Sequence, residues 1–390
     1  MLTSGFRVRH VARRLFSCSS TVTASEPALR SRSSDTLASA RGRVPASIWA
    51  KTSAQLHLRR NHPLNTLRKH IEAYIHEKYP STFRMHSSLP PVVSTVQCFD
   101  DLRVPLGHVS RAPTDTYYVD DTTLLRTHMT AHDVELLAAG ETAFLLCGDV
   151  YRRDTVDRTH YPVFHQVDAA RLFPSGTSRK QVEEDLKQTL SGLAKALFGD
   201  VEMRWVEGYF PFTHPSFELE VAWQGEWLEV LGCGLLHREV LQRGGVSDDV
   251  EGWAFGMGLE RLAMVLFGVP DIRLFWSEDE RFLGQFNERG IEARYKPFSV
   301  FPAVEKDVSF WVEDISRFHE NDIHELAREV CGDLVENVKV VDTFKKGGSL
   351  SLCFRITFRS MEKTLTHAEV NKLYNEFRTQ ISETLPVTLR

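Results

Sequence analysis

The chain of 390 residues lacks several features that would assign it to a specialised class of protein. It has no run of 18 or more apolar residues, so the sequence predicts no membrane-spanning helix. Its cysteines include no CxxC pair, which disfavours a disulfide framework and a cysteine–zinc knot. They are scattered, at Cys18, Cys98, Cys147, Cys233, Cys331 and Cys353. An excess of positive charge is also missing. The net charge is −5, which argues against broad attraction to nucleic acid.

What the chain does have is the composition of a globular protein, with 42% hydrophobic and 25% charged residues. This composition excludes a collagen-like, coiled-coil or wholly disordered chain. At about 150 residues per domain, the length predicts roughly two to three domains.

Residues 1–50 differ sharply from the rest of the chain. They hold eight Arg, no Lys, ten Ser and two acidic residues, a net charge of +6 that leaves −11 on the remainder. Arginine- and serine-rich, acid-poor segments are typical of organelle transit peptides, and the apolar residues between Phe6 and Phe16 can share a helix face. We expect a disordered transit peptide for the mitochondrial matrix. A plastid or dual address has a similar composition, and a basic tail without targeting function is the alternative.

The composition shifts again near residues 288–300 and predicts a linker at 291–300 between a large domain, 55–290, and a small domain, 301–390. In the large domain the apolar spacing predicts strands interspersed with helices, without regular βαβ alternation. This pattern favours an α+β fold with a mostly antiparallel sheet. The expected elements are helices at 61–78, 182–197 and 257–267, and strands at 143–153, 162–169, 218–223 and 226–231.

The small domain shows two alternating strands, at 308–312 and 350–358, and two helical periods, at 319–331 and 367–383. A β-α-β-β-α order fits a ferredoxin-like unit, with helices on one face of its sheet. The other face would show Trp311, Arg355 and Arg359. Aromatic and cationic side chains together suit the bases and phosphates of RNA, whereas an ordinary solvated face is the alternative.

Chemistry-bearing residues are densest between Gly148 and Asp168. On two antiparallel strands, Arg152 would stand beside a face formed by Phe164, Gln166 and Asp168. A guanidinium matches phosphate through two parallel hydrogen bonds, and the amide with the carboxylate suits a primary ammonium group. A surface hairpin held by ion pairs is the alternative.

Three further segments offer partners for that face. Gly256-Met257-Gly258 precedes a helix that carries Arg261, and glycines at a helix start favour close approach of an anion. Glu229 lies in an apolar strand, where burial is costly unless the charge is paired. Phe210 and Phe212 form an aromatic cluster. Each segment also has an ordinary interpretation as close packing, a solvent-facing arginine or part of the core.

Together these segments resemble the class II aminoacyl-tRNA synthetases. YRRD…HYPVFHQVD and GMGLERLAM are similar to the second and third signature motifs of that family. The segments at 99–105, 115–118, 125–128 and 209–212 are similar to phenylalanyl-tRNA synthetase catalytic subunits, and 301–310 to their ferredoxin-fold anticodon-binding domain. A single chain with both parts resembles the organellar phenylalanyl-tRNA synthetases. The resemblance covers about 60–390.

The resemblance implies a role for each candidate residue. As catalytic residues, Arg152 would hold the α-phosphate of ATP and Arg261 its γ-phosphate. The other expected ATP-binding residues are Thr159, His160, Tyr161 and Phe255. The expected substrate-binding residues are His128, Thr130, Ala131, His132, Asp133, Gln166, Val167, Asp168, Phe210, Phe212 and Glu229. The expected tRNA-binding residues are Trp311, Arg355 and Arg359.

The resemblance also implies the partners: tRNA(Phe), phenylalanine, and ATP with Mg²⁺. We expect a monomer that binds no membrane and holds no metal of its own. His128 and His132 stand at zinc-like spacing, but no glutamate lies between them and no third ligand is evident.

The sequence departs from the family pattern at four places. Met129-Thr130 stands where Thr-Ser is usual, Asp133 where Gln is expected, Asp168 where Glu is usual, and Val109 replaces a common proline. Two alternatives to a phenylalanine enzyme remain. A synthetase-like RNA-binding protein without catalysis is disfavoured because Arg152 and Arg261 are both present. Another class II specificity is disfavoured by the aromatic segment 209–212.

Overall fold

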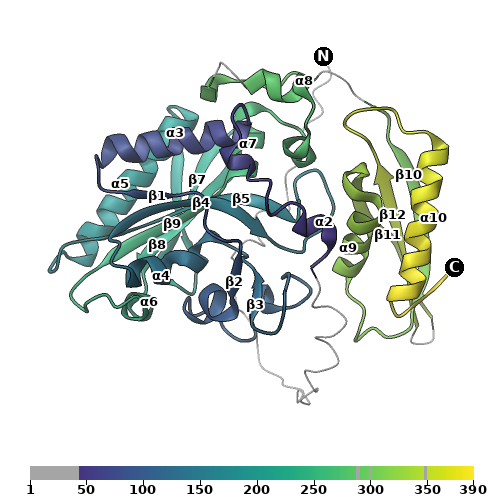
Figure 1. The fold of residues 1–390 in the computed structure, drawn as a ribbon, viewed down its shortest axis with the longest axis horizontal. Coiled ribbons are helices and arrows are strands. Elements are labelled where there is room, and N and C mark those ends of the chain that lie inside the picture. Colours follow the sequence, from purple (N-terminus) through teal and green to yellow (C-terminus); the bar gives the residue numbers. More distant parts are fainter. Residues whose placement is uncertain (1–43, 287–289, 298–300, 347–348) are drawn as a thin grey trace.

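The computed structural model describes residues 44–286, 290–297, 301–346 and 349–390. Most of the expected transit peptide, 1–43, therefore lies outside the described residues. The expectation of disorder is wrong for residues 44–50, because Ala46–Trp49 form a helix and Val44 and Ile48 are buried in the large core. The described chain folds around two separate sheets, one of seven strands and one of four, each with its own hydrophobic core (Figure 1). In Figure 1 the large domain stands on the left and the small domain on the right.

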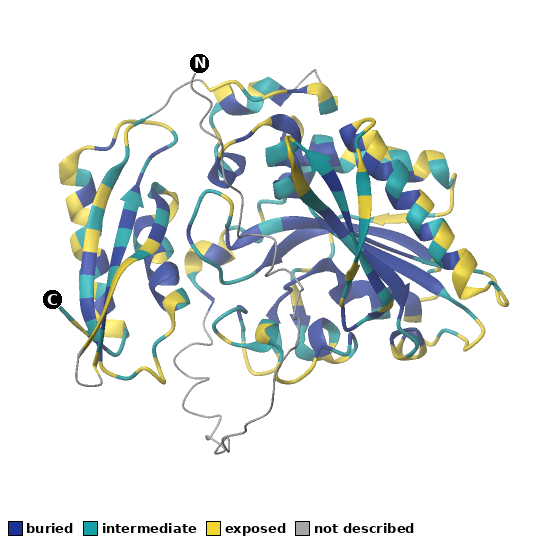
Figure 2. Ribbon diagram, turned by 180° about the vertical axis from the view of Figure 1, so that it is seen from behind, coloured by how far each residue is buried: buried dark blue, intermediate teal, exposed yellow. Residues whose placement is uncertain are grey.

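The seven-stranded sheet forms the centre of the large domain. Neighbouring strands are antiparallel except the first pair, which is parallel. Every residue of the second strand in this order is buried, because helices cover both faces there, and the central strands are almost continuously dark blue in Figure 2. In spatial order the strands are β1 (Arg84–His86), β4 (Ala143–Tyr151), β5 (Val163–Leu172), β9 (Gly252–Gly258), β8 (Glu226–Leu236), β7 (Thr213–Trp223) and β6 (Met203–Gly208).

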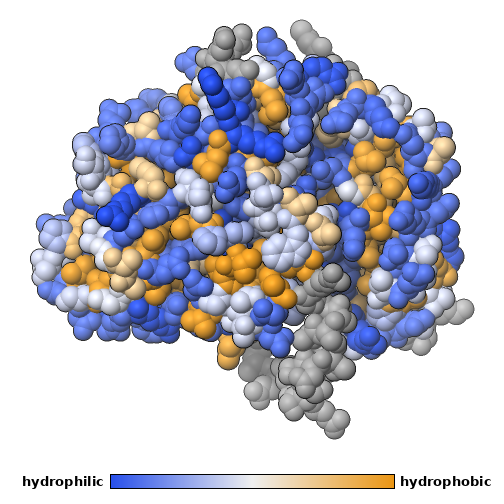
Figure 3. Space-filling view, in the orientation of Figure 1, coloured by the Kyte–Doolittle hydropathy of each residue, from blue (hydrophilic) through white to orange (hydrophobic). Residues whose placement is uncertain are grey.

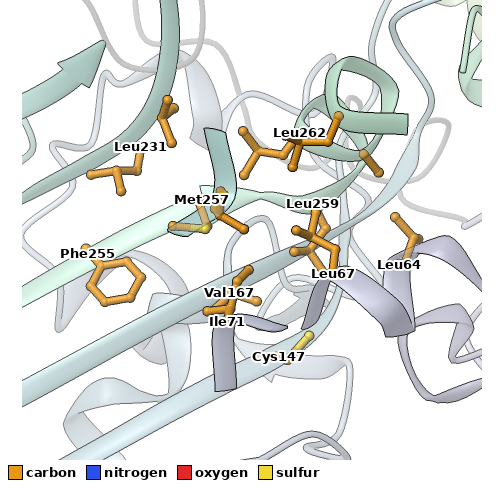
Figure 4. Close-up of a cluster of buried hydrophobic side chains, with 14 of the residues drawn as sticks. Leu64, Leu67, Ile71, Cys147, Val167, Leu231, Phe255, Met257, Leu259 and Leu262 are labelled. Atoms are coloured by element: carbon orange, nitrogen blue, oxygen red, sulfur yellow. The ribbon is translucent and has the colours of Figure 1, made fainter. Parts of the chain in front are cut away.

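Three long helices cover one face of this sheet: α3 (Pro63–Lys78), α5 (Arg179–Phe198) and α7 (Leu259–Phe267). Figure 4 shows the contact of α3 and α7 with the strands, where Leu67 and Ile71 of α3 lie close to Val167 of β5. Apolar residues recur every three or four positions along each helix, which places one stripe against the sheet.

Short elements cover part of the opposite face and form a second core with β4 and β8. They leave the middle of this face open to the site described below. These elements are η2 (Val96–Asp100), η4 (Met129–His132), α4 (Asp133–Ala138), α6 (Arg238–Arg243), and the paired strands β2 (Val92–Ser94) and β3 (Thr123–Leu125).

Short helices make up the rest of the large domain. Ala293 is fully buried in the large core, and the Tyr295 N–H donates to the Phe267 carbonyl at 2.7 Å, so part of the expected linker packs on this domain. These helices are α2 (Ala46–Trp49), η1 (Leu56–Leu58), η3 (Val109–Arg111), η5 (Ile272–Trp276), α8 (Glu280–Leu283), η6 (Gly284–Phe286) and η7 (Gly290–Glu292).

The small domain has the expected ferredoxin-like order and one strand more than the sequence predicted. The sheet order is β11-β12-β10-β13, and both helices pack on one face around Phe310 and Phe354. The elements are β10 (Val304–Val312), α9 (Glu320–Cys331), η8 (Gly332–Leu334), β11 (Val335–Lys346), β12 (Ser349–Phe358), α10 (His367–Thr384) and β13 (Val387–Leu389).

Local signals explain where the helices begin. Ser178 and Gln181 form a capping box at the start of α5, and Thr366 with Glu369 forms another at α10. Helix α3 begins two residues later than predicted, because the His62 side chain caps it by accepting from the Leu64 N–H, while Asn61 adopts a positive φ of 70°. Gly256 and Gly258 end a strand, so α7 begins two residues later than predicted.

The two domains meet at the loop between β4 and β5. Val156 from this loop belongs to the core of the small domain. Its N–H donates to His324 Nδ1 at 3.1 Å, and its carbonyl accepts from the Val338 N–H at 3.0 Å. In the part of the chain that the structure describes, no helix has the length and apolarity to cross a membrane. Figure 3 shows a mostly hydrophilic surface with apolar side chains in separate patches.

Candidate active site

Glycines form the floor of the candidate site on the open face of the large sheet. Asp168, Gly256 and Gly232 are direct neighbours across β5, β9 and β8. A Cβ atom on Gly256 would lie 2.9 Å from Asp168 Oδ1, and one on Gly232 would lie 2.5 Å from Phe210 Cζ. Real side chains do not approach so closely, so the carboxylate and the ring can lie over these strands only because both floor residues are glycine.

A polar group lies at one end of the floor. Thr130 Oγ1 donates to Asp168 Oδ2 at 2.7 Å, and Gln166 Oε1 accepts from the Met129 N–H at 3.3 Å. These bonds fix the turn η4 over the strand β5. Asp168 Oδ1 and Asp133 Oδ1 are buried and have no hydrogen-bond partner among the described residues. The site therefore presents acceptors that a bound ammonium group would satisfy.

Burial changes the protonation of both carboxyl groups. It raises the pKa of Asp168 to about 6, although the bonds from Thr130 and the nearby charges of Arg152 and Arg126 act in the opposite direction. It raises the pKa of Asp133 well above its ordinary value, and the neighbouring charge of Asp168 raises it further. The pair therefore holds protons more tightly than ordinary carboxylates do.

Aromatic side chains line the other end of the floor. The rings of Phe210 and Phe212 stack with centroids 6.1 Å apart, and the ring of Phe212 lies 6.2 Å from that of His128. Burial, followed by the charge of Arg152, lowers the pKa of His128 to about 3, so its imidazole is neutral. An apolar ring against uncharged aromatic faces is the expected occupant of such a pocket.

The two arginines predicted to bind phosphate each contact groups of the protein. The guanidinium of Arg152 lies 5.1 Å from the centre of the Phe164 ring, and its Nε donates to the Thr127 carbonyl at 2.8 Å. Arg261 Nη1 lies 3.7 Å from Glu229 Oε2. Burial raises the pKa of Glu229 to about 7, while the charge of Arg261 opposes this shift.

A buried network supports the turn that carries His128 and Thr130. Arg126 pairs with Asp149 at 2.9 Å and contacts His132 Nε2 at 3.0 Å, while His132 Nδ1 lies 2.7 Å from Glu135 Oε1. Both ring nitrogens of His132 are therefore engaged. The structure gives His132 the role of holding the turn, and its neighbour Ala131 is buried in the apolar core beneath it.

A second buried pair joins β5 to α7, the helix that carries Arg261. Glu260 Oε2 accepts from the His165 N–H at 2.7 Å, and Glu260 Oε1 lies 2.6 Å from His165 Nδ1. Pairing of β5 with β9 ends at Gln166, so the carboxylate takes the place of the missing strand at His165. No local pattern of residues indicated this bond or the Arg126–Asp149 pair.

Several predicted site residues lie elsewhere. Phe255 and Val167 alternate with Gly256 and Asp168, so their side chains point into the core under the opposite face, as Figure 4 shows. The predicted side-chain contacts of Phe255 and Val167 with ligand are therefore wrong. Phe164 was predicted on the same face as Gln166 and Asp168, but it was given no role in ligand binding.

Three other predicted ATP contacts lie in the loop that faces the small domain. Tyr161 stacks on Trp276 with centroids 5.5 Å apart, and its hydroxyl donates to Asp333. His160 Nδ1 lies 2.6 Å from Asp157 Oδ2, and Thr159 is exposed. His160 and Tyr161 line a cavity of about 280 Å³ between the domains. The structure does not bring these three residues to the glycine floor.

The predicted tRNA-binding residues divide into two groups. Arg355 is partly exposed and makes two bonds of 2.7 Å to Asp307, and Trp311 packs edge-on against Phe344 with centroids 6.0 Å apart. Arg359 instead bonds to the buried Glu336 and to a backbone carbonyl. The expectation that Arg359 stands on an open face is wrong, because the docked domains enclose Glu336.

Two family models and several known proteins are similar to this chain. Residues 49–286 match the family model of the tRNA synthetases class II core domain (F), and 299–390 match the ferredoxin-fold anticodon binding domain. The chloroplastic/mitochondrial phenylalanine–tRNA ligase of Arabidopsis thaliana is 50% identical over 89% of this chain and 82% of its own.

Two mitochondrial relatives are similar over comparable lengths. The phenylalanine–tRNA ligase of Dictyostelium discoideum is 42% identical over 90% of this chain and 89% of its own. That of Saccharomyces cerevisiae is 37% identical over 89% of this chain and 92% of its own. With both domain models and these relatives matched, the chain belongs to the class II aminoacyl-tRNA synthetases, in the family of the mitochondrial-type phenylalanine–tRNA ligases.

Proposed function

We propose that this chain activates phenylalanine with ATP and transfers it to the terminal ribose of tRNA(Phe). One observation carries the proposal: a buried carboxylate and a stacked pair of phenylalanine rings lie on one glycine floor. Asp168 would take the substrate ammonium with Gln166, and Phe210 with Phe212 would contact the substrate ring. Such ring contacts contribute about 0.5–1.5 kcal/mol per pair beyond burial.

In the first step, an oxygen of the phenylalanine carboxylate bonds to the α-phosphorus of ATP, and the bond from that phosphorus to the pyrophosphate oxygen breaks. No protein nucleophile is needed, so the chain contributes position and charge. Arg152 would hold the α-phosphate and Arg261 the γ-phosphate. Phe164, under the guanidinium of Arg152, offers a flat surface for the adenine ring.

In the second step, a ribose hydroxyl at the tRNA end attacks the acyl carbon, and AMP leaves. The neutral state of His128, set by its burial, keeps a second positive charge away from the substrate ammonium.

Class II synthetases use ATP, and we propose that Mg²⁺ enters with it. Among the described residues no group of three His, Cys, Asp or Glu side chains stands ready to hold a metal ion alone. Mg²⁺ commonly binds through one or two carboxylates together with substrate phosphates. Glu229, beside Arg261, fits this need. The ion would neutralise charge on the phosphates.

For tRNA, we propose that Trp311 and Arg355 contact the anticodon side from the open face of the small domain. We also propose that the transit peptide lies within residues 1–43, and that the catalytic domain includes α2 and the packed residues Ala293 and Tyr295. We propose 301–390 as the anticodon-binding domain, and a monomeric enzyme. The relatives are named mitochondrial or chloroplastic/mitochondrial, and this chain acts in the mitochondrion.

ATP–pyrophosphate exchange with each of the twenty amino acids tests the function. We expect exchange with phenylalanine alone at low substrate concentration. Arg152→Ala should abolish it, whereas Arg204→Ala, which removes an arginine paired on the surface with Glu220, should keep it. Normal exchange in a folded Arg152→Ala variant would contradict the assigned role.

A further inference from the structure

The ammonium end of the site contains two buried carboxyl groups. Asp168 comes from β5 and is 4% exposed, while Asp133 begins α4 and is 2% exposed. Each has a buried oxygen without a hydrogen-bond partner among the described residues. Two like charges that share a dry site cannot both ionise at ordinary cost, so one of them keeps a proton.

The surrounding groups do not relieve this cost at Asp133. Arg152 and Arg126 favour the ionised form of Asp168, and Arg126 is already paired with Asp149. On the adjoining turn, His128 is neutral. The other histidine of that turn, His132, is engaged by Arg126 and Glu135.

The basic residues of the packed helix α6 are engaged elsewhere as well. Arg238 pairs with Glu251, and Arg243 donates to the Asp100 carbonyl. From η2, Cys98 lies against His128 and Thr127, and its burial raises the thiol pKa, which keeps it neutral. Asp168 is thus the charged neighbour that acts on Asp133, and it acts to keep Asp133 protonated.

A bound ammonium group reverses this balance. Its positive charge offers donors to the oxygens that lack partners, and it compensates a second negative charge. We propose that Asp133 is protonated in the empty site and releases its proton to solvent when the substrate ammonium binds, so that amino-acid capture and proton release are one event. This inference rests on the proposed function, because it assigns the ammonium to this end of the floor.

Linkage fixes the sign of the effect. If binding releases one proton, affinity for phenylalanine rises with pH, by up to about tenfold per pH unit, while the empty site is still protonated. Above the pH at which the empty pair loses that proton, affinity levels off. A site with a single ionised carboxylate would show no such slope near neutral pH.

Calorimetric titration of the full chain with L-phenylalanine measures the proton directly. At pH 7 the binding heat should vary with buffer ionisation enthalpy, with a slope that corresponds to about one released proton. L-Phenylalaninol, which keeps the ammonium and lacks the carboxylate, should give the same slope, and 3-phenylpropanoate should give none. A slope of zero for phenylalanine overturns the inference.

Asp133→Asn tests the assignment to this residue. The variant should still bind phenylalanine, but without proton release and with a KM that is flat between pH 6.5 and 8. Asp101→Asn is the matched control, since burial also raises the pKa of Asp101 but Asp168 does not act on it. An unchanged slope in Asp133→Asn contradicts the proposal.

The inference and the function fail in different ways. Absence of phenylalanine-dependent exchange in the wild type would overturn the function. Normal exchange with no proton release would overturn only the inference. If Asp133→Asn does not fold, the comparison of phenylalaninol with phenylpropanoate on the wild type still decides the question.

Discussion

Gly232→Ala should damage the phenylalanine site without harming the ATP site. The added methyl group would lie 2.5 Å from Phe210 Cζ and 3.0 Å from its Cε2, inside the range that real contacts avoid. Phe210 is 4% exposed and stacked on Phe212, so its ring has no open space into which it can retreat. The ring pair must therefore shift toward the position of the substrate ring.

The magnitude follows from the cost of overpacking, about 1–3 kcal/mol for an added methyl group in a tight core. If this cost falls on substrate binding, KM for phenylalanine rises about 5- to 150-fold, because about 1.4 kcal/mol corresponds to tenfold. KM for ATP should stay within about twofold of the wild-type value. Pyrophosphate exchange at varied concentrations of each substrate measures both quantities.

Two further variants make the reasoning refutable. Gly284→Ala is the control, because a Cβ atom there meets nothing within 4 Å. Phe210→Leu combined with Gly232→Ala should recover part of the lost affinity, since the smaller side chain removes the clash, and the double-mutant cycle measures the coupling. A normal KM for phenylalanine in Gly232→Ala, or no coupling with Phe210→Leu, would refute the role of the glycine floor.

Two other predictions concern Asp168 and Arg355. Burial raises the folded-state pKa of Asp168 from 3.8 to about 6. Ionisation of this group above pH 6 therefore lowers the free energy of unfolding by up to about 3 kcal/mol. This cost disappears below the unfolded-state pKa, so Asp168→Asn should raise the melting temperature at pH 7.5 and leave it unchanged near pH 3.5. The same variant should lose pyrophosphate exchange. A lower melting temperature at pH 7.5 would be evidence against the burial cost. Arg355→Ala should weaken tRNA binding and reduce its salt slope by about one, as filter binding between 50 and 200 mM salt would show. Unchanged binding would exclude Arg355 from the tRNA surface, and Lys180→Ala, a change on the exposed face of α5, serves as the control.

The sequence predicts well what depends on short-range periodicity. Alternation along 162–169 placed Gln166 and Asp168 together on one face, and the helical period at 367–383 predicted α10 to within one residue. Phe255 was misplaced because its assignment came from resemblance, although the same alternation puts it opposite Gly256. At Phe255, the alternation of side chains along the strand predicts the orientation better than the resemblance does.

What depends on tertiary contact was not predictable. Arg359 follows the last residue of β12 and continues its alternation, but it meets Glu336, whose other partner Arg158 comes from the large domain. No local pattern foretells which loop docks on a sheet. The buried pair of Arg126 and Asp149 is hidden for the same reason, since 23 positions separate its members.

Val156 has a consequence for how the chain can be divided. The residue is attached to the large domain through β4 and β5, yet it is 5% exposed because it fills part of the small domain's core. A fragment cut before residue 301 would leave Val156 in water and deprive Arg158 of Glu336. The loop that follows Arg152 would then lose the contacts of Val156 and Arg158 that hold it in place. The small domain thus supplies part of the packing for the loop beside Arg152, the arginine proposed to hold the α-phosphate. Its removal should therefore slow amino-acid activation even in the absence of tRNA.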